Sequence, residues 1–310
     1  MKVKVQAKLP GQIADVDLRL LRVFKAVAEC GGIAAAELEL NVGMPTISRQ
    51  IKDLEERLGL VLCRRGRAGF ALTAEGKELY AATLQLLAAT TDFRSRVEGI
   101  HQQVGGELHL AIFEKTVSNP ESHVERALEA FHRAAPSVKL HVHVGTIAAI
   151  EQGVLGGQFQ VGIVPEHRRS DSLAYWPLFG ESMKLYVGRG HAWFAEAERR
   201  WDWADLRRQR LAGLDYHSPN LRLTHARKLE RHASASDQEA VALLILSGSF
   251  VGFLPDHYAQ PFVEAQRMRA VSAGLLGYEC RFSCIHRNDP PPARAAALLV
   301  QALEAAHPRR

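Results

Sequence analysis

Apolar and polar residues recur with helical spacing in three segments near the start of the chain. The first segment begins at Asp17, a residue type that favours helix N-caps, and ends at Gly31 and Gly32. A second segment, residues 33–40, leads into a turn at residues 41–43. A third begins at Pro45, whose missing N–H is harmless in a first helical turn. The pattern predicts helices joined by a tight, glycine-containing turn.

The third segment presents its polar side chains to one side. Ile47, Ile51, Leu54 and Leu58 fall on a single helical face, which turns the polar residues of the first turns outward. A DNA major groove admits one α-helix, and such side chains near its N-terminus reach bases and phosphates. An amphipathic helix with solvated polar residues explains the same pattern. The candidate DNA-contacting residues are Pro45, Thr46, Ser48, Arg49, Gln50 and Lys52.

A basic hairpin follows this segment. Gly59 ends the helix, and residues 60–73 read as two short strands around a glycine-containing turn. The turn region carries Arg64, Arg65 and Arg67. Basic side chains beside a candidate recognition helix predict a wing that contacts DNA phosphates.

A long helix is expected from about Thr73. Its apolar residues follow a heptad in which Arg96 takes one position, and it runs to Gly105 and Gly106. Such a stripe is commonly intramolecular core, but between two domains it also suits a linker that dimerises. The apolar positions are Leu79, Ala82, Leu86, Ala89, Phe93 and Ile100.

Strand and helix patterns alternate in the remaining two thirds of the chain. Alternation of this kind predicts a mainly parallel sheet, arranged here as two α/β lobes. The expected strands are residues 108–113, 139–144, 158–164, 183–188, 210–214, 250–254 and 279–285, and the expected helices are residues 120–134, 147–155, 203–206, 221–231, 237–247 and a C-terminal helix.

Polar residues follow several of these strands, where open α/β sheets bind ligands and helix N-termini attract anions. The sequence at residues 118–121 also reads as an ordinary helix start, and the other positions admit the same interpretation as turns, caps or solvated histidines. The candidate effector-binding residues are Thr116, Ser118, Asn119, Thr146, His167, Tyr216, His217 and Ser218.

Charge adds to the case for DNA at the start of the chain. The net charge is +5, and residues 1–72 hold twelve Lys and Arg against eight Asp and Glu, a net +4. Cys30, Cys63, Cys280 and Cys284 are dispersed, and residues 1–11 lack the apolar run of a signal peptide. With no apolar run near ~20 residues, we expect a soluble, cytoplasmic protein without a membrane partner.

Catalytic, cofactor and metal motifs are weak or missing. Asp215, His217 and Ser218 are too close in sequence to form a catalytic line by themselves, and no GxSxG, P-loop or GxGxxG motif occurs. His141 and His143 share a strand face but have no cysteine or carboxylate at ligand spacing. We therefore expect no enzyme activity, no cofactor and no metal.

Residues 17–76 resemble the DNA-binding domain of LysR-type transcriptional regulators. The resemblance rests on GGIAAAELELNVGMPTISRQI, LEERLG, the basic wing and LTAEG, with Ser48, Leu54 and Gly59 where the family pattern has them. The later stretches RAAPSVKLHVHVG, GGQFQVGIV, GHAWF and GFLP resemble the family's effector domain through their order. Glu37, Gly43, Met44 and Cys63 depart from the pattern, and Glu37 is expected to strain helix packing.

The resemblance implies a fold that is α/β overall. It consists of an N-terminal all-α winged helix-turn-helix at residues 15–73, a long linker and dimerisation helix at residues 74–104, and a two-lobed, periplasmic-binding-like effector domain at residues 105–310. It implies double-stranded DNA, a small organic anion as effector, RNA polymerase and a homodimer or homotetramer as partners. A cytosolic small-molecule-binding protein with a degenerate DNA-binding head remains the alternative.

Overall fold

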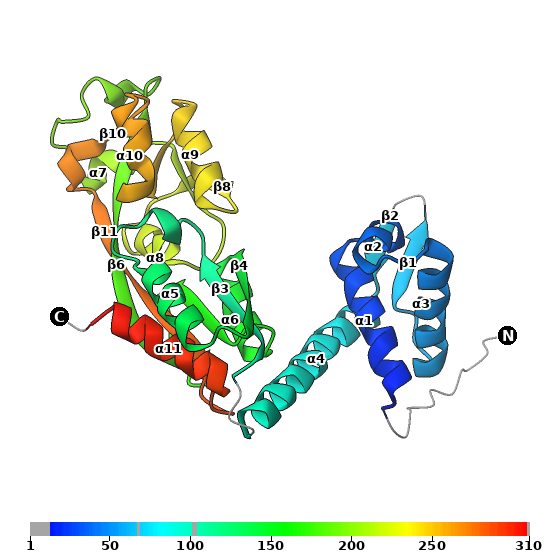
Figure 1. Cartoon of the computed structure of the whole chain (residues 1–310). Coiled ribbons are helices and arrows are strands. Elements are labelled where there is room, and N and C mark those ends of the chain that lie inside the picture. Colours follow the sequence, from blue (N-terminus) through cyan, green and yellow to red (C-terminus); the bar gives the residue numbers. More distant parts are fainter. Residues whose placement is uncertain (1–12, 67–68, 101–103, 309–310) are drawn as a thin grey trace. The chain divides into compact units, whose positions relative to one another are not determined.

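A computed structural model describes residues 13–66, 69–100 and 104–308 (Figure 1). The chain divides into two compact units, Met1–Phe93 and Arg94–Arg310. In the described residues, no helix is both long and apolar enough to cross a membrane.

The smaller unit begins with the three expected helices, α1 (Asp15–Glu29), α2 (Ile33–Leu40) and α3 (Met44–Leu58). Their apolar faces meet in one core in which Phe24, Ile47 and Ile51 are fully buried. Gly59 adopts a left-handed conformation with φ of 66° and ends α3, as its sequence position predicts.

The prediction that Asp17 caps α1 is wrong, because the helix begins two residues earlier. Asp17 is instead the third helical residue, and its carboxylate accepts a hydrogen bond from the Ala14 N–H at 2.9 Å. It also accepts one from Arg57 Nε at 2.6 Å, which ties α1 to the end of α3. The hydrogen bond from Arg57 lowers the pKa of Asp17 below its ordinary value.

The expected wing is present as the antiparallel strands β1 (Cys63–Gly66) and β2 (Gly69–Leu72). The Glu55 carboxylate accepts hydrogen bonds from the N–H groups of Leu62 (2.7 Å) and Cys63 (3.2 Å), and so fixes the start of the hairpin against α3. Thr73 then begins the next helix, since its hydroxyl accepts the Gly76 N–H at 2.9 Å.

The long helix α4 (Ala74–Ile100) follows. Leu79 and Leu86 of the predicted heptad pack against the core of the smaller unit. Ala82 and Ala89 are exposed, and Phe93 keeps 68% of its surface exposed. The heptad therefore divides into an intramolecular part and a part that faces solvent in the single chain. The side chains at its two last positions, Arg96 and Ile100, lie outside the described part of the chain.

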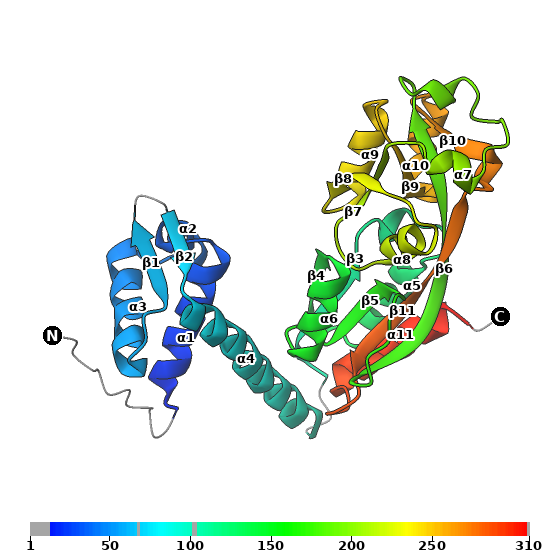
Figure 2. The ribbon, with the colours of Figure 1, turned by 180° about the vertical axis from the view of Figure 1, so that it is seen from behind.

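The larger unit contains two lobes of parallel strands, as predicted, joined by two long strands whose antiparallel pairing and full length were not predicted (Figures 1 and 2). The strand order is β4-β3-β5-β11-β6-β9-β7-β8, with β10 paired to β6. The strands are β3 (Gly106–Phe113), β4 (Val138–Gly145), β5 (Val161–Pro165), β6 (Leu173–Gly188), β7 (Leu211–Leu214), β8 (Arg231–Ala235), β9 (Val251–Pro255), β10 (Met268–Ala270) and β11 (Gly277–Arg287).

The two long strands belong to both lobes. β6 starts ten residues before the expected strand at Met183, and it pairs with β11 from Leu173 to Lys184. The first lobe holds β3, β4 and β5, and the second holds β7, β8, β9 and β10 (Figure 2). The helices of this unit are α5 (Val124–Ala134), α6 (Ile147–Leu155), α7 (Trp203–Leu206), α8 (Pro219–Ala226), α9 (Gln238–Leu246), α10 (Asp256–Glu264) and α11 (Arg294–Ala306).

Three sequence predictions in this unit need correction. The helix expected at residues 120–134 begins at Val124, because Asn119 forms a local turn by accepting the Glu121 N–H. The helix expected at residues 221–231 ends at Ala226, and Arg231 starts β8. The helix α10 was missed, since Pro261 interrupts its pattern.

Gly76 offers a test of the packing between the wing and α4. A Cβ at this position would overlap the Leu62 carbonyl oxygen. Helix propensity alone predicts that Gly76→Ala stabilises the protein by roughly 1 kcal/mol, whereas the overlap predicts destabilisation of about 1–3 kcal/mol. We expect destabilisation, measured from the first urea unfolding transition of the full chain. A stabilised variant would contradict the close approach of the Leu62 carbonyl.

Candidate functional site

The N-terminal half of α3 presents a polar face suited to DNA. Pro45, Thr46, Arg49 and Lys52 are exposed, and Ser48 and Gln50 are half-buried. The buried Ile47 and its helical neighbours hold this face outward. Lys52 forms an exposed ion pair with Glu56, with Nζ and Oε1 3.4 Å apart, and such a contact is weak enough to be exchanged for a phosphate.

Glu37 completes the N-terminus of α3. Gly43 occupies the N-cap position and provides no side-chain acceptor. The Glu37 carboxylate accepts the Met44 N–H instead, at 3.1 Å, and places negative charge where the helix dipole favours it. The expected strain at Glu37 is not what the structure shows: this departure from the family pattern supplies the cap that Gly43 lacks.

The wing brings Arg64 to the surface of the same unit. Its side chain is exposed on β1, opposite Ala71 of β2. Arg65 lies on β1 by its backbone, but its side chain is outside the described part of the chain, as is all of Arg67. The described part of the wing therefore adds one exposed cation to the α3 face.

A second candidate site lies between the lobes of the larger unit. It is a narrow cleft formed by the carboxyl ends of β3, β5 and β7 and the N-termini of α6, α8 and α9. Its free volume is about 20 Å³, room for about one water molecule. The residues that line it are Phe113, Ile147, Pro165, Glu181, Met183, Leu214, Ser218, Pro219, Asn220, Gln238, Tyr278 and Cys280.

Polar atoms from the second lobe are buried in this cleft without partners. Asn220 and Gln238 are each 4% exposed, and neither Asn220 Oδ1 nor Gln238 Oε1 has a hydrogen-bond partner among the described residues. The nearby Tyr216 hydroxyl is also buried and has no hydrogen-bond partner among the described residues. A buried polar atom left unpaired costs about 1–3 kcal/mol, so a bound molecule that satisfied these atoms would gain that energy.

The lobes are held together by the segment that follows β3. Glu114 Oε1 accepts the Gln238 N–H at 2.8 Å, and Lys115 Nζ lies 3.6 Å from Glu239 Oε2. Burial is the main cause that raises the pKa of Glu114 above its ordinary value. These contacts join the first lobe to the start of α9 and hold the cleft closed.

A histidine extends this link. Ser118 Oγ lies 3.0 Å from His257 Nδ1, and His257 Nε2 lies 2.9 Å from Glu181 Oε1. Ser118 belongs to the first lobe, His257 to α10, and Glu181 to the shared strand β6. The buried Glu181 side chain therefore has a partner already and does not stand as a free charge in the cleft.

The remaining candidates from the first lobe are engaged in local hydrogen bonds. Thr116 Oγ1 donates to the Phe113 carbonyl at 2.7 Å, and Asn119 Nδ2 donates to the Gly180 carbonyl at 2.9 Å. Thr146 caps α6 by accepting the Ala149 N–H at 3.3 Å. Of the eight predicted effector residues, Ser218 alone lines the narrow cleft, where its hydroxyl caps α8.

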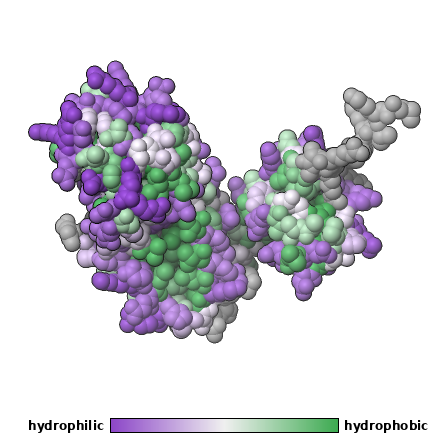
Figure 3. Space-filling model, turned by 90° about the horizontal axis from the view of Figure 1, so that it is seen from above, coloured by the Kyte–Doolittle hydropathy of each residue, from purple (hydrophilic) through white to green (hydrophobic). Residues whose placement is uncertain are grey.

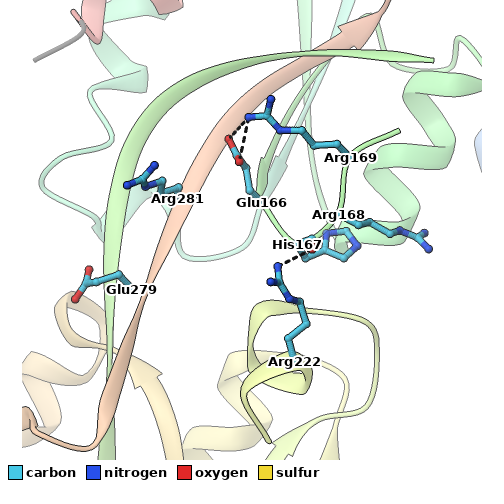
Figure 4. Close-up of a pocket in the computed structure, with 7 residues that line it drawn as sticks. All are labelled: Glu166, His167, Arg168, Arg169, Arg222, Glu279 and Arg281. Atoms are coloured by element: carbon cyan, nitrogen blue, oxygen red, sulfur yellow. Dashed lines mark hydrogen bonds and ion pairs between the residues drawn. The ribbon is translucent and has the colours of Figure 1, made fainter. Parts of the chain in front are cut away.

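His167 lies instead in a wider basic pocket on the other face of β11 (Figure 4). This pocket has a volume of about 350 Å³ and carries four arginines. Arg169 pairs with Glu166 at 3.3 Å, and Arg222 donates to the His167 carbonyl at 2.7 Å. The lining residues are Glu166, His167, Arg168, Arg169, Arg222, Glu279 and Arg281.

The His167 side chain is itself buried against Glu151, with His167 Nδ1 and Glu151 Oε1 3.8 Å apart. Burial lowers the pKa of His167 and raises that of Glu151. Burial thus disfavours the charged form of each group, while Arg168 Nη2 lies 3.8 Å from Glu151 Oε2 and favours its carboxylate.

The comparisons with known proteins cover both units. Residues 18–77 match the model of the bacterial regulatory helix-turn-helix protein, lysR family, and residues 101–308 match the LysR substrate binding domain. The chain is a LysR-type transcriptional regulator. It is 40% identical to the HTH-type transcriptional activator BauR of Pseudomonas aeruginosa over 287 residues, which are 91% of this chain and 92% of that protein.

Solved structures agree with this assignment. Full-length CbnR complexed with its target DNA matches with a TM-score of 0.62 and 25% identity, covering 93% of this chain and 99% of that one. A full-length OxyR variant from Pseudomonas aeruginosa shares the fold, with a TM-score of 0.57, 18% identity and coverage of 96% and 97%. A LysR-type regulator binds DNA and is not an enzyme, and the alternative of a degenerate head is not favoured.

Sequence reasoning missed the polar residues of the cleft in this LysR-type regulator. Asn220 is the second residue of α8, which was expected to begin only at Leu221, and Gln238 is the first residue of α9, directly after Asp237. Polar residues in the first turn of two such helices were the available signal. Cys280 and Cys284 are buried, and burial raises the pKa of both thiols, that of Cys284 to about 12.

The cap formed by Glu37 can be tested by substitution. Glu37→Ala removes the acceptor of the Met44 N–H, and we expect a loss of about 0.5–2 kcal/mol in the stability of the smaller unit, measured by urea unfolding. Glu39→Ala is the matched control, because Glu39 is exposed on the same helix and carries the same charge. Equal effects of the two substitutions would show that charge, and not capping, accounts for the loss.

Proposed function

We propose that this regulator acts as a homo-oligomer whose paired α3 helices read successive major grooves, while a small organic anion bound between the lobes controls its activity. The contacts on DNA come from α3 through Pro45, Thr46, Ser48, Arg49, Gln50 and Lys52, and from the wing through Arg64, Arg65 and Arg67. The observation that carries the DNA part is the polar face of α3, held outward by a buried apolar face on a head that matches the LysR model.

The oligomer is supported by apolar surface that the single chain leaves exposed. Phe93 is 68% exposed on α4, beyond the part of the helix that packs on the head. On the larger unit, Val142, Val144 and Leu243 are also exposed, and Figure 3 shows apolar areas on one face of that unit. Exposed apolar groups of this kind favour association with a second copy.

The effector site that we propose is the narrow cleft rather than the basic pocket. The arginines of the basic pocket include Arg169 and Arg222, which already have partners. The cleft instead combines the N-termini of α6 and α8, which attract an anion, with unpartnered acceptors on Asn220 and Gln238. Such a site favours a small carboxylate that also carries a hydroxyl or ammonium group to donate hydrogen bonds.

The predicted effector residues take different places in this proposal. Ser218 is assigned to the cleft and Tyr216 and Thr146 to its border, while Thr116, Ser118 and Asn119 belong to the first-lobe segment after β3 that holds the cleft closed. His167 lines the basic pocket, and His217 is close enough to His167 to lower its pKa, so neither is assigned to the effector.

Binding requires the lobes to separate, because the closed cleft has room for about one water molecule. We infer that the protein works in the cytoplasm as an activator that contacts RNA polymerase. This role is supported by its similarity to the activator BauR.

DNA reading is tested with the duplex upstream of the protein's own gene and a scrambled duplex, by fluorescence anisotropy at two salt concentrations. We expect Arg49→Ala to weaken binding to the upstream duplex by roughly 5- to 150-fold, equivalent to about 1–3 kcal/mol for a base contact. Arg22→Ala on α1 is the control, since it removes the same charge from an exposed position of the head. Equal losses for the two variants would mean that general charge, and not α3, governs binding.

The effector site is tested by thermal unfolding of the full chain with propionate and with lactate, which differ by one hydroxyl. We expect lactate to stabilise the protein more than propionate. Gln238→Leu should raise the lactate concentration needed for the same thermal stabilisation by about tenfold, because one well-formed hydrogen bond is lost. Gln260→Leu, on the exposed surface of α10, is the control. Loss of the response in Arg222→Ala instead would place the effector in the basic pocket.

A further inference from the structure

Three histidines and a glutamate share one face of the sheet in the first lobe. Glu107 and His109 lie on β3, and His141 and His143 lie on β4. The parallel register places His109 beside His141, and alternate residues of a strand point to the same face. The four side chains therefore meet near the edge of the sheet, because β4 is its outermost strand on this side.

Three of these side chains bring possible metal-ligand atoms close to one another. His141 Nε2 lies 3.7 Å and His109 Nε2 lies 4.0 Å from Glu107 Oε2. All three ligand atoms lie within 4.8 Å of one another. Ligands at 2.0–2.1 Å around a tetrahedral ion are roughly 3.3 Å apart, so small side-chain rotations would complete the geometry.

His143 fixes the orientation of one candidate ligand. Its Nε2 lies 3.0 Å from His109 Nδ1. When Nδ1 of His109 donates this hydrogen bond, its Nε2 keeps a lone pair directed toward Glu107 and His141. Histidines that bind metal commonly donate their second N–H in this way, and the partner sets both tautomer and ring orientation.

The other groups at the cluster are consistent with an open ligand position. His141 Nε2 is buried and has no hydrogen-bond partner among the described residues, although an imidazole nitrogen normally has one. Lys139 Nζ approaches Glu107 from the opposite side, 3.9 Å from Oε1, and leaves Oε2 for the histidines. The ring centroids of His109 and His141 lie 4.5 Å apart.

The geometry points to a site for a divalent transition-metal cation, with Zn²⁺ as the representative ion, bound by Glu107, His109 and His141. Imidazole and carboxylate ligands favour Zn²⁺, Ni²⁺ or Cu²⁺ over Ca²⁺ and Mg²⁺. Three protein ligands leave one position for water or another donor. The cation would join the edge strand β4 to β3, and His143 acts as a positioning residue. The sequence alone predicted no metal here.

The test is a Zn²⁺ titration of the untagged full chain by isothermal calorimetry. We expect one Zn²⁺ per chain, binding reduced to background in His141→Ala, and binding weakened about 10- to 100-fold in His143→Leu. His132→Ala is the control, because His132 is an exposed histidine on α5 of the same lobe. Wild-type binding no stronger than that of His141→Ala, or binding lost equally in His132→Ala, would overturn the proposal.

Cobalt distinguishes this site from Cys30 and Cys63, the two cysteines that are only partly buried. Co²⁺ bound by nitrogen and oxygen shows visible d–d bands without the strong thiolate charge-transfer band of a cysteine site. We expect that spectrum, and we expect Glu107→Gln to diminish it while circular dichroism stays unchanged. A thiolate band, or a spectrum that Glu107→Gln leaves intact, would assign the cation elsewhere and overturn the site.

Discussion

The larger unit depends on the antiparallel pairing of β6 with β11. These strands pair from Leu173 with Arg287 to Lys184 with Gly277, with one irregularity between Arg281 and Ser283. The parallel strands of the first lobe join this ladder through β5 and those of the second through β9. Both lobes are thus anchored to one pair of strands, with the carboxyl ends of their parallel strands facing the same cleft. The cleft can widen only if this ladder bends or if its junctions with the lobes move.

Two opposing contributions decide whether the cleft stays closed: contacts between the lobes favour closure, and buried polar atoms without hydrogen-bond partners disfavour it. Glu114, Lys115 and Ser118 reach from the first lobe to partners in the second. Against these contacts stand Asn220 and Gln238, whose buried oxygens lack partners at the described residues. A ligand that donates to those oxygens would offset the cost of separating the lobes. In the proposed effector site, the hydrogen-bond donors of a ligand would therefore matter as well as its size.

The smaller unit has a different requirement, because α3 must expose polar groups on one face while its other face belongs to the core. Buried Ile47 and Ile51 fix the helix. Asp17 accepts a hydrogen bond from Arg57 at the end of α3, and Glu55 accepts one from the Leu62 N–H at the start of the wing. Glu37 replaces the cap that Gly43 cannot provide. A departure from the family pattern at one position is thus compensated by another close in space, so DNA binding need not be lost.

The sequence by itself determined the smaller unit and most strands and helices of the larger one, because those features depend on local periodicity, caps and turns, but it missed β8, β10 and α10. The helices at residues 33–40 and 44–58, Gly59 as a helix end and the short wing all follow from neighbours in sequence. Tertiary structure alone decided the full length of β6, the burial of Asn220 and Gln238 in the cleft, and the meeting of His109 with His141. Each depends on which strands pair and in what register, and that is set by packing between segments distant in sequence. For the same reason His167, placed correctly after a strand, lies on the other face of β11 from the cleft.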